Sequence, residues 1–239
     1  MAYNFLGLVN DVNRRLNEVE LTSSNFPTAI GAYSQTKDSI NAAIRDINQQ
    51  EFEWPFNHNT QEDTLVAGTV RYAFPADAKT IDFDSFRIKR NDSFGIDTKK
   101  LKVISYEEYL ETYADYEYNT TDTGIRGVPY LVFRTPDQKY GVVQPPDKAY
   151  ELVYEYYALP TDLVDATDVP TVPVQFRHLI VDGAMYYAYL FRGNSQDAGL
   201  LQAKFQEGIK NMRSLYINRY EYVRDTRVSK GYSKGVKVV

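Results

Sequence analysis

The spacing of hydrophobic residues along the chain changes from helical to alternating and back again, which predicts helices at both ends and strands between them. Near the start, apolar residues recur every three or four positions and predict an amphipathic helix. Its apolar face consists of Phe5, Leu8, Val9, Val12, Leu16 and Val19. A second, longer helical stripe consists of Ile30, Tyr33, Ile40, Ile44 and Ile47. The short connection, with capping side chains at 22–25 followed by Pro27, favours an antiparallel pair.

Apolar and polar residues alternate from about Glu51 onward, and this pattern predicts at least five short strands. The β-prone segments are 70–74, 81–83, 101–103, 130–134, 140–144 and 150–158. Pro136 and Asp137 lie between the fourth and fifth segments and predict a hairpin turn. A capping box formed by Ser105 and Glu108 predicts a short helix within this β-rich stretch.

Helical spacing returns after an acidic linker. Pro173 suits the first turn of a helix that runs to Phe191. Gly193 and Asn194 are expected to end that helix, and Ser195 is expected to cap the next. The apolar stripe of the last helix consists of Leu201, Phe205, Ile209, Met212 and Tyr216. If this helix reaches Tyr222, it is about 40 Å long.

These patterns predict an α+β protein with three parts. An antiparallel helical bundle is expected from both chain ends, residues 1–50 plus 161–224. A small antiparallel β-rich module is expected as an insertion at residues 51–160. Residues 225–239 are expected to form a flexible, extended C-terminal tail, because glycines and lysines there disfavour a helix.

Composition places the chain among globular proteins and adds a hint of assembly. Of its 239 residues, 43% are hydrophobic and 25% are charged. Tyrosine is abundant, with 21 residues against 12 phenylalanines and one tryptophan. Because tyrosine joins an apolar ring to a hydroxyl, it suits half-buried surfaces such as subunit interfaces. The sequence shows no leader pattern and no apolar run of about 18 residues, so we expect a soluble, unprocessed protein made inside the cell, with no membrane span.

Charge is unevenly distributed along the chain. The net charge is −5, yet residues 225–239 carry four cations and one acid and therefore contribute +3. The first 224 residues carry −8, which argues against a protein whose main task is to grip phosphate backbones.

No pattern of side chains predicts catalysis, metal binding or cofactor binding. The chain has no cysteine, which excludes disulfides and cysteine–zinc sites. Of the two histidines, His58 is expected in an exposed polar turn and His178 in a partly buried structural position. The acidic groups at 107–117 and 162–168 lack the spacing of a calcium loop and any accompanying catalytic motif, so solvated surfaces explain them more simply. We therefore predict that the protein is not an enzyme.

The stretch "YELVYEYYALPTDLVDATDVPTVPVQFRHLIVDGAMYYAYL", residues 150–190, carries a resemblance to a known family. It combines a strand ending in Tyr-Tyr, a proline, an acidic linker, Pro-x-x-Phe and a helix containing Gly-Ala. Together with the N-terminal helices and the "EWPFN" turn at 53–57, it resembles the head-to-tail adaptor proteins of tailed bacteriophages, also called connector, gatekeeper or tail tubular proteins.

The resemblance implies a structural virion protein made in the host bacterial cytoplasm and located at the head–tail interface. Such adaptors form a ring, commonly a dodecamer, beneath the portal protein, and they continue the DNA channel toward a tail nozzle or tail tube protein. The implied partners are therefore the portal, further copies of the chain, a tail protein and transiting double-stranded DNA without sequence-specific contact. No membrane partner is implied.

Two groups of residues are candidates for these contacts. The basic, glycine-punctuated C-terminal ribbon is expected to bind the portal or a neighbouring subunit through Arg227, Val228, Lys230, Tyr232, Lys234, Val236, Lys237, Val238 and Val239. Tyrosines on more than one side of the last two helices are expected at contacts between subunits, and they are Tyr186, Tyr189, Tyr216 and Tyr220.

Two other classes of function stay open at this point. A carbohydrate-binding or other virion or surface binding module would use an exposed Trp54 and tyrosines as sugar platforms. An enzyme would need a pocket with converging titratable groups, with His178 or Glu111 as the residues to test.

Overall fold

The structure, a computed structural model, describes residues 2–92, 95–118 and 123–217 and has mixed helix and sheet. It divides into two compact units. The helical unit comprises Met1–Phe56 and Pro160–Val239, and the β unit comprises Asn57–Leu159. Mixed helix and sheet is compatible with the expected α+β class. The domain boundaries and the tail expected from the sequence stay predictions.

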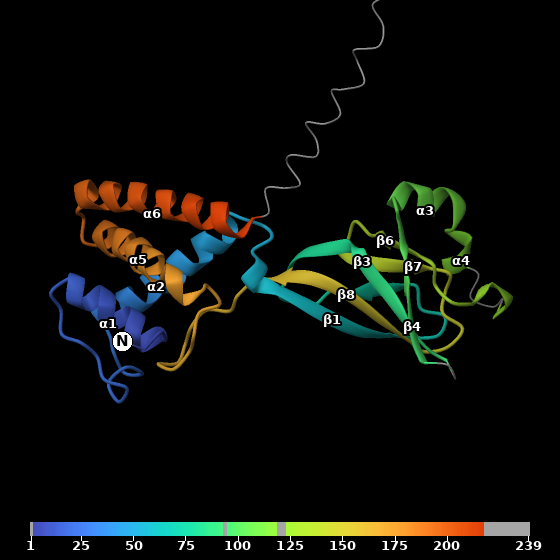
Figure 1. Cartoon of the computed structure of the whole chain (residues 1–239), viewed down its shortest axis with the longest axis horizontal. Coiled ribbons are helices and arrows are strands. Elements are labelled where there is room, and N and C mark those ends of the chain that lie inside the picture. Colours follow the sequence, from blue (N-terminus) through green and yellow to red (C-terminus); the bar gives the residue numbers. More distant parts are fainter. Residues whose placement is uncertain (1, 93–94, 119–122, 218–239) are drawn as a thin grey trace, which may run out of the picture. The chain divides into compact units, whose positions relative to one another are not determined.

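Four helices build the described part of the helical unit (Figure 1). They are α1 (Phe5–Arg15), α2 (Ala32–Gln49), α5 (Arg177–Phe191) and α6 (Ser195–Tyr216). Helix α5 follows a 3₁₀ turn, η3 (Val174–Phe176), and packs against each of the other three helices. Its central place explains why it is apolar on almost every side, with eight buried residues among its fifteen.

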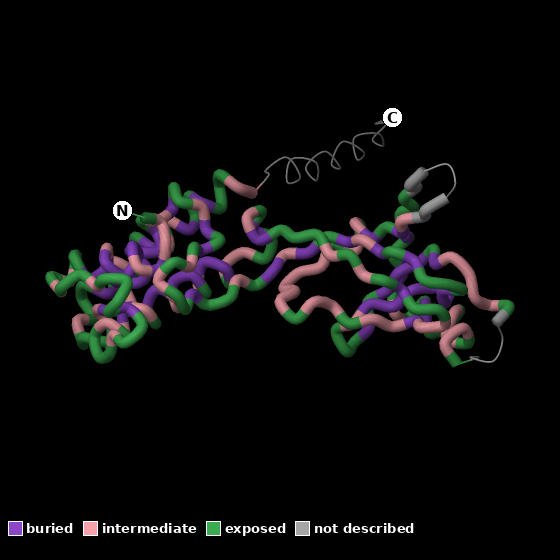
Figure 2. The backbone as a smooth tube through the Cα atoms, turned by 90° about the horizontal axis from the view of Figure 1, so that it is seen from below, coloured by how far each residue is buried: buried purple, intermediate pink, exposed green. Residues whose placement is uncertain are grey.

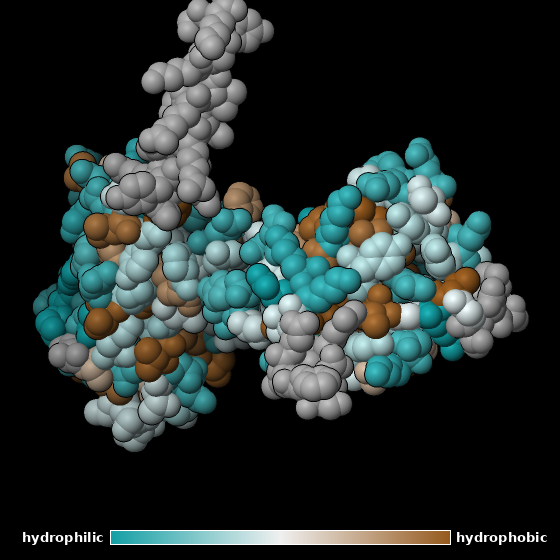
Figure 3. Space-filling model, turned by 45° about the vertical axis from the view of Figure 1, so that its right-hand side comes forward, coloured by the Kyte–Doolittle hydropathy of each residue, from teal (hydrophilic) through white to brown (hydrophobic). Residues whose placement is uncertain are grey.

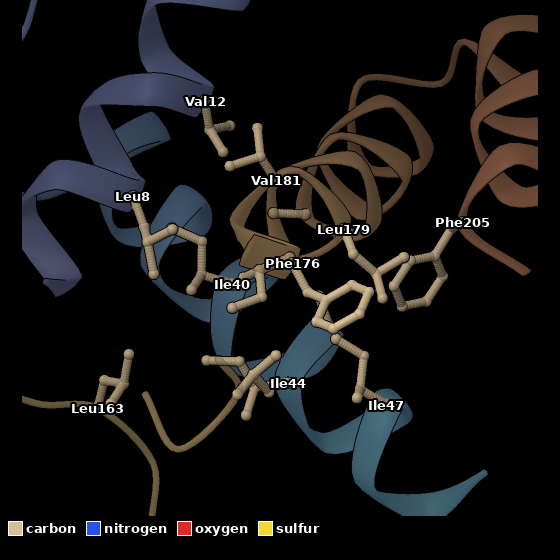
Figure 4. Packing of buried hydrophobic residues seen from close by; sticks show 14 of the residues in the cluster. Leu8, Val12, Ile40, Ile44, Ile47, Leu163, Phe176, Leu179, Val181 and Phe205 are labelled. Atoms are coloured by element: carbon tan, nitrogen blue, oxygen red, sulfur yellow. The ribbon is translucent and has the colours of Figure 1, made fainter. Parts of the chain in front are cut away.

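Apolar side chains from all four helices meet in one core (Figure 4). Leu8 of α1, Ile44 of α2 and Leu179 of α5 are among its buried members. A Cβ atom at Gly183 would lie 2.6 Å from the Phe205 ring and 2.9 Å from the Ala43 Cβ. The missing side chain therefore lets α2, α5 and α6 approach closely.

Helix ends differ from the sequence prediction at three places. Helix α1 ends at Arg15, so Val19 is 74% exposed and does not extend its apolar face. Helix α2 begins at Ala32 after Gly31 with φ +65°, which leaves Ile30 outside and 82% exposed. The N-cap of α6 is Asn194, whose side chain accepts from the Asp197 N–H. The expected continuation of α6 to Tyr222 lies outside the described residues.

The β unit contains two four-stranded sheets. Sheet A has the order β1 (His58–Leu65), β8 (Tyr150–Ala158), β3 (Ala78–Asp92), β4 (Gly95–Lys100), with antiparallel neighbours throughout. Sheet B has the order β2 (Arg71–Ala73), β7 (Lys139–Val143), β6 (Leu131–Arg134), β5 (Lys102–Ile104), and only β5 and β6 are parallel. The short helices α3 (Tyr106–Thr112) and α4 (Asp115–Tyr118) and the 3₁₀ turns η1 (Pro55–Asn57) and η2 (Thr123–Ile125) complete the described elements.

Sheet B is buried on both faces, and this explains its composition. Val132 belongs to the core shared with sheet A, whereas Leu131 and Phe133 belong to a second core with Tyr109 of α3. Strand β6 is therefore an uninterrupted apolar run rather than an alternating one. Gly141 lies opposite Phe133, where a Cβ atom would approach the ring to 2.1 Å. Figure 2 shows the buried backbone running through the strands of both sheets.

Several local predictions in the β unit are confirmed. Strands β6 and β7 form the expected hairpin, and β8 alternates so that Leu152, Tyr154 and Tyr156 are buried. Ser105 caps α3 by accepting from the Glu108 N–H. One prediction is wrong: His58 does not lie in a turn but begins β1. Strand β1 lies at a sheet edge, and its polar sequence lacks the alternation of apolar residues that indicates a strand.

Candidate interaction surfaces

Three of the four tyrosines expected at subunit contacts are described, and all three are half-buried within the helical unit. The Tyr216 hydroxyl accepts from the Gln175 amide at 2.8 Å, and its ring centroid lies 5.7 Å from that of Phe176. Tyr189 packs against the helical core, and the Tyr186 ring lies 4.9 Å from the Tyr187 ring. Each ring thus has intramolecular contacts and retains an exposed part. Their role between subunits stays a prediction.

Tyr220 and the nine residues of the C-terminal ribbon, from Arg227 to Val239, lie outside the described residues. Their expected contacts with a portal or a neighbouring subunit stay a prediction.

Ion pairs fix the helices of the helical unit to one another. Asp182 of α5 is only 2% exposed, and its two carboxylate oxygens lie 2.6 Å from Arg15 Nη1 of α1 and 2.8 Å from Lys204 Nζ of α6. Arg177 of α5 pairs with Asp11 of α1 at 2.6 Å and also donates to the Ala2 and Gly7 carbonyls. A buried carboxylate is costly without cationic partners, so the arrangement that brings Arg15 and Lys204 to Asp182 is favoured. Asp182 thereby links α1, α5 and α6.

Two fully buried tyrosines in the β unit converge on one carboxylate. The Tyr140 and Tyr154 hydroxyls lie 2.7 and 3.1 Å from Asp63 Oδ2 of β1. Burial raises the pKa of both tyrosines well above the ordinary value, and the Asp63 carboxylate raises it further. Their hydroxyls therefore stay protonated and donate hydrogen bonds, which is a structural role.

A second tyrosine–carboxylate contact connects α3, α4 and sheet B. The Tyr109 hydroxyl donates to Glu117 at 2.7 Å, and Arg71 of β2 pairs with the same carboxylate at 2.9 Å. Burial and the Glu117 hydrogen bond raise the pKa of Tyr109 above its ordinary value. Glu117, one of the acidic residues at 107–117, therefore connects α4 to Tyr109 of α3 and Arg71 of β2.

The structure does not assemble a catalytic site from the histidines. His58 is exposed and lies 3.1 Å from Glu155 on the neighbouring strand. His178 is exposed at the start of α5, so the expected partly buried position is wrong. The sequence did not show this, because His178 stands between two residues that are buried, Phe176 and Leu179, and adjacent positions of a helix differ in exposure.

The acidic linker has local structural partners. Asp168 accepts from the Val164 and Asp165 N–H groups at 2.8 Å, and these hydrogen bonds lower its pKa. Asp162 pairs with Arg45 at 3.2 Å. Within the described ranges, no group of three His, Cys, Asp or Glu residues could hold a metal ion.

Trp54 does not form a sugar platform. Its side chain is fully buried in the helical core, its indole N–H donates to the Ile47 carbonyl at 2.8 Å, and its ring stacks on Phe56. The carbohydrate-binding alternative required an exposed Trp54, and the buried position does not meet this requirement.

Apolar side chains remain exposed on the helical unit outside its core. They are Val19, Ile30, Phe52, Val164, Val169, Val174, Leu190, Phe191, Leu200 and Leu215. On the face drawn in Figure 3, hydrophilic side chains predominate and apolar ones form separate patches between them. None of the helices in the described ranges is long and apolar enough to cross a membrane.

Comparison with known families shows to which family the chain belongs. The model of one family, described as SU10 adaptor protein, matches residues 3–229 and so spans both units. The chain belongs to the SU10 adaptor protein family. SU10 adaptor proteins are structural phage proteins and components of the virion, and theirs is not an enzyme family. The resemblance to phage head-to-tail adaptors is confirmed. No curated protein matches the SU10 adaptor chain described here.

Proposed function

We propose that this protein is a head-to-tail adaptor that forms a ring beneath the portal of a tailed phage, continues the DNA channel and presents the surface to which the tail attaches. The observation that carries the proposal is the match of the SU10 adaptor family model along residues 3–229. A dodecamer is the expected copy number, and a tail nozzle or tail tube protein is the expected partner on the far side.

The surfaces of the helical unit support a protein that binds other proteins. Ion pairs of Asp182 link three of its helices, and exposed apolar residues such as Phe191 and Leu215 are available to neighbours. The exposed parts of Tyr186, Tyr189 and Tyr216 are the proposed contacts between adjacent helical units. A heterologous contact repeated around an axis closes a ring.

Charge supports a channel that DNA crosses without being held. The first 224 residues carry −8, so a wall made from them repels phosphate rather than binding it. The basic residues 225–239 are proposed to dock on an acidic surface of the portal or of a neighbouring subunit. The protein thereby separates DNA passage from portal binding.

Mixing the purified full-length protein with purified portal rings of the same phage tests the proposal. We expect a monomeric or weakly associated protein alone and, on the portal, a complex whose added mass corresponds to one ring. Mass photometry gives the stoichiometry, and electron microscopy gives the position of the added density. A folded protein that leaves the portal mass unchanged would contradict the proposed function.

A further inference from the structure

Sheet A of the β unit has two open edges. Among the described residues, β1 pairs only with β8 and β4 pairs only with β3, so both outer strands have backbone groups directed away from the sheet (Figure 1). Strand β1 has eight residues and β4 has six, which is long enough to pair with a further strand. Unprotected edges of this length tend to pair with other chains.

The directions of the two edge strands are opposite. Sheet A has four strands, and every neighbouring pair is antiparallel, so β1 and β4 run in opposite directions. When two copies are placed in succession, β4 of one copy therefore meets β1 of the next as an antiparallel neighbour. The sheet continues from one copy to the next without a change in its pattern.

The described charges on the solvent face differ between the two edges. Strand register places Glu62, Val153, Arg87 and Lys100 in one row across β1, β8, β3 and β4. Glu62 is thus the charge at one end of this row and Lys100 the charge at the other. Like edges of two copies repel one another, whereas a β1 edge and a β4 edge attract.

The present partners of these charges do not prevent such a contact. Glu62 pairs with Lys89 and retains 61% of its side-chain exposure, and Lys100 pairs with Asp84 at 3.1 Å while half exposed. Ion pairs at such exposed positions contribute at most about 1 kcal/mol. Both side chains can therefore contact an additional charge at little cost to their present ion pairs.

We infer that neighbouring copies of this chain join head-to-tail through sheet A, with β4 of one copy pairing with β1 of the next. The contact forms a continuous antiparallel sheet around the ring, and Glu62 of each copy faces Lys100 of its neighbour. This inference rests on the proposed function, because it identifies a surface that closes the adaptor ring. It adds backbone hydrogen bonds to the contacts proposed for the helices.

Cross-linking tests the pairing directly, because the natural chain has no cysteine. Thr60→Cys on β1 and Thr98→Cys on β4 are exposed positions on the two edges. A mixture of the two single-cysteine proteins, treated with a flexible bis-maleimide, should give cross-linked dimers. Each protein alone should give none, since like edges do not meet. A chain with both cysteines should give a ladder of multiples in the presence of portal rings.

Charge exchange provides a second measurement. Glu62→Lys and Lys100→Glu should each lower the yield of the ladder about fivefold. The double variant should restore the yield, because every contact then contains the same pair with its signs reversed. Glu151→Lys is the matched control, since it makes the same charge change at an exposed position on the inner strand β8 and should leave the yield unchanged.

The outcomes separate this inference from the proposed function. Binding of a full ring to the portal without β1–β4 cross-links would overturn the inference and leave the adaptor function intact. Cross-links without portal binding would support the sheet contact and contradict the adaptor function. Dimers from one cysteine variant alone, or links from an edge to the portal instead of a second copy, would also overturn the inference.

Discussion

A single methyl group added at Gly141 provides the sharpest test of packing at the residue scale. The new Cβ atom would lie 2.1 Å from the Phe133 ring, which is itself stacked on Tyr109. Because Phe133 is fully buried and cannot move into solvent, Gly141→Ala should lower the free energy of unfolding by about 1–3 kcal/mol. Guanidinium unfolding followed by far-UV circular dichroism measures the change.

Gly199→Ala is the control for that substitution. Nothing lies within 4 Å of a Cβ atom at this exposed position in α6, and alanine favours a helix over glycine by up to about 1 kcal/mol. We expect no loss of stability there. Equal losses at the two positions would contradict the packing argument.

The hairpin turn at 135–139 provides a test by pH. Lys139 and Thr135 both hydrogen-bond the Asp137 carboxylate and lower its pKa to about 2. A lowered carboxyl pKa stabilises the folded turn fully above the ordinary value of 3.8, and this contribution is lost as pH falls through about 2. An NMR titration of the Asp137 carboxyl carbon should show this midpoint, and Lys139→Met should raise it. An unchanged midpoint in that variant would rule out Lys139 as the main cause.

Individual residues also show where sequence patterns lose information. Hydrophobicity could not decide whether Trp54 is a binding platform or a core residue, because both uses require the same aromatic ring. The buried Asp182 has no sequence signal either, since its partners Arg15 and Lys204 are 167 and 22 positions away. Only the packing of three helices brings these charges together.

At the scale of whole elements, the ion pairs of Asp182 predict an asymmetry between substitutions. The double change Arg15→Met and Lys204→Met leaves a buried carboxylate without a cation, and it should cost about 3 kcal/mol or more. Asp182→Asn removes the charge itself and should cost less. Arg192→Met is the control, because its pair with Glu18 is exposed and contributes at most about 1 kcal/mol.

Thermal and denaturant unfolding of the natural protein and the three variants measures these differences in stability. If Asp182→Asn proved more damaging than the double change, the carboxylate would contribute more through its hydrogen bonds than it costs through its burial. That result would contradict the ordering proposed here.

Helices and strands were predictable where one of their faces is buried and the other is exposed to solvent. Strand β8 alternates because Leu152 and Tyr154 face the core, and the helical stripes of α1 and α2 follow the same logic. Strand β1 was missed because it lies at a sheet edge, where seven of its eight residues are polar and Leu65 alone is buried. Helix ends were displaced by backbone features such as Gly31, which periodicity does not register.

At the scale of the whole molecule, the basic C-terminal stretch predicts salt-dependent docking. Deleting residues 225–239 removes a charge of +3 and should leave the described helices folded while weakening portal binding. The difference from the full chain should fall as salt increases and screens the charge of the intact protein. Mass photometry of portal occupancy at several salt concentrations measures the effect.

A charge-neutral variant of full length separates charge from chain length. Lys230→Ala, Lys234→Ala and Lys237→Ala together should reproduce most of the salt-dependent loss. Unchanged docking of both the truncated and the neutral protein would assign no binding role to the C-terminal stretch.

The buried position of Trp54 has an optical consequence. It is the only tryptophan of the chain and belongs to the helical unit, so indole fluorescence reports on that unit alone, whereas circular dichroism reports on both. Unfolding curves recorded by the two signals on the Gly141→Ala variant therefore compare the units within one sample. A shift of the dichroism curve alone would show that the β unit unfolds by itself, and a common shift would show that damage in one unit is transmitted to the other.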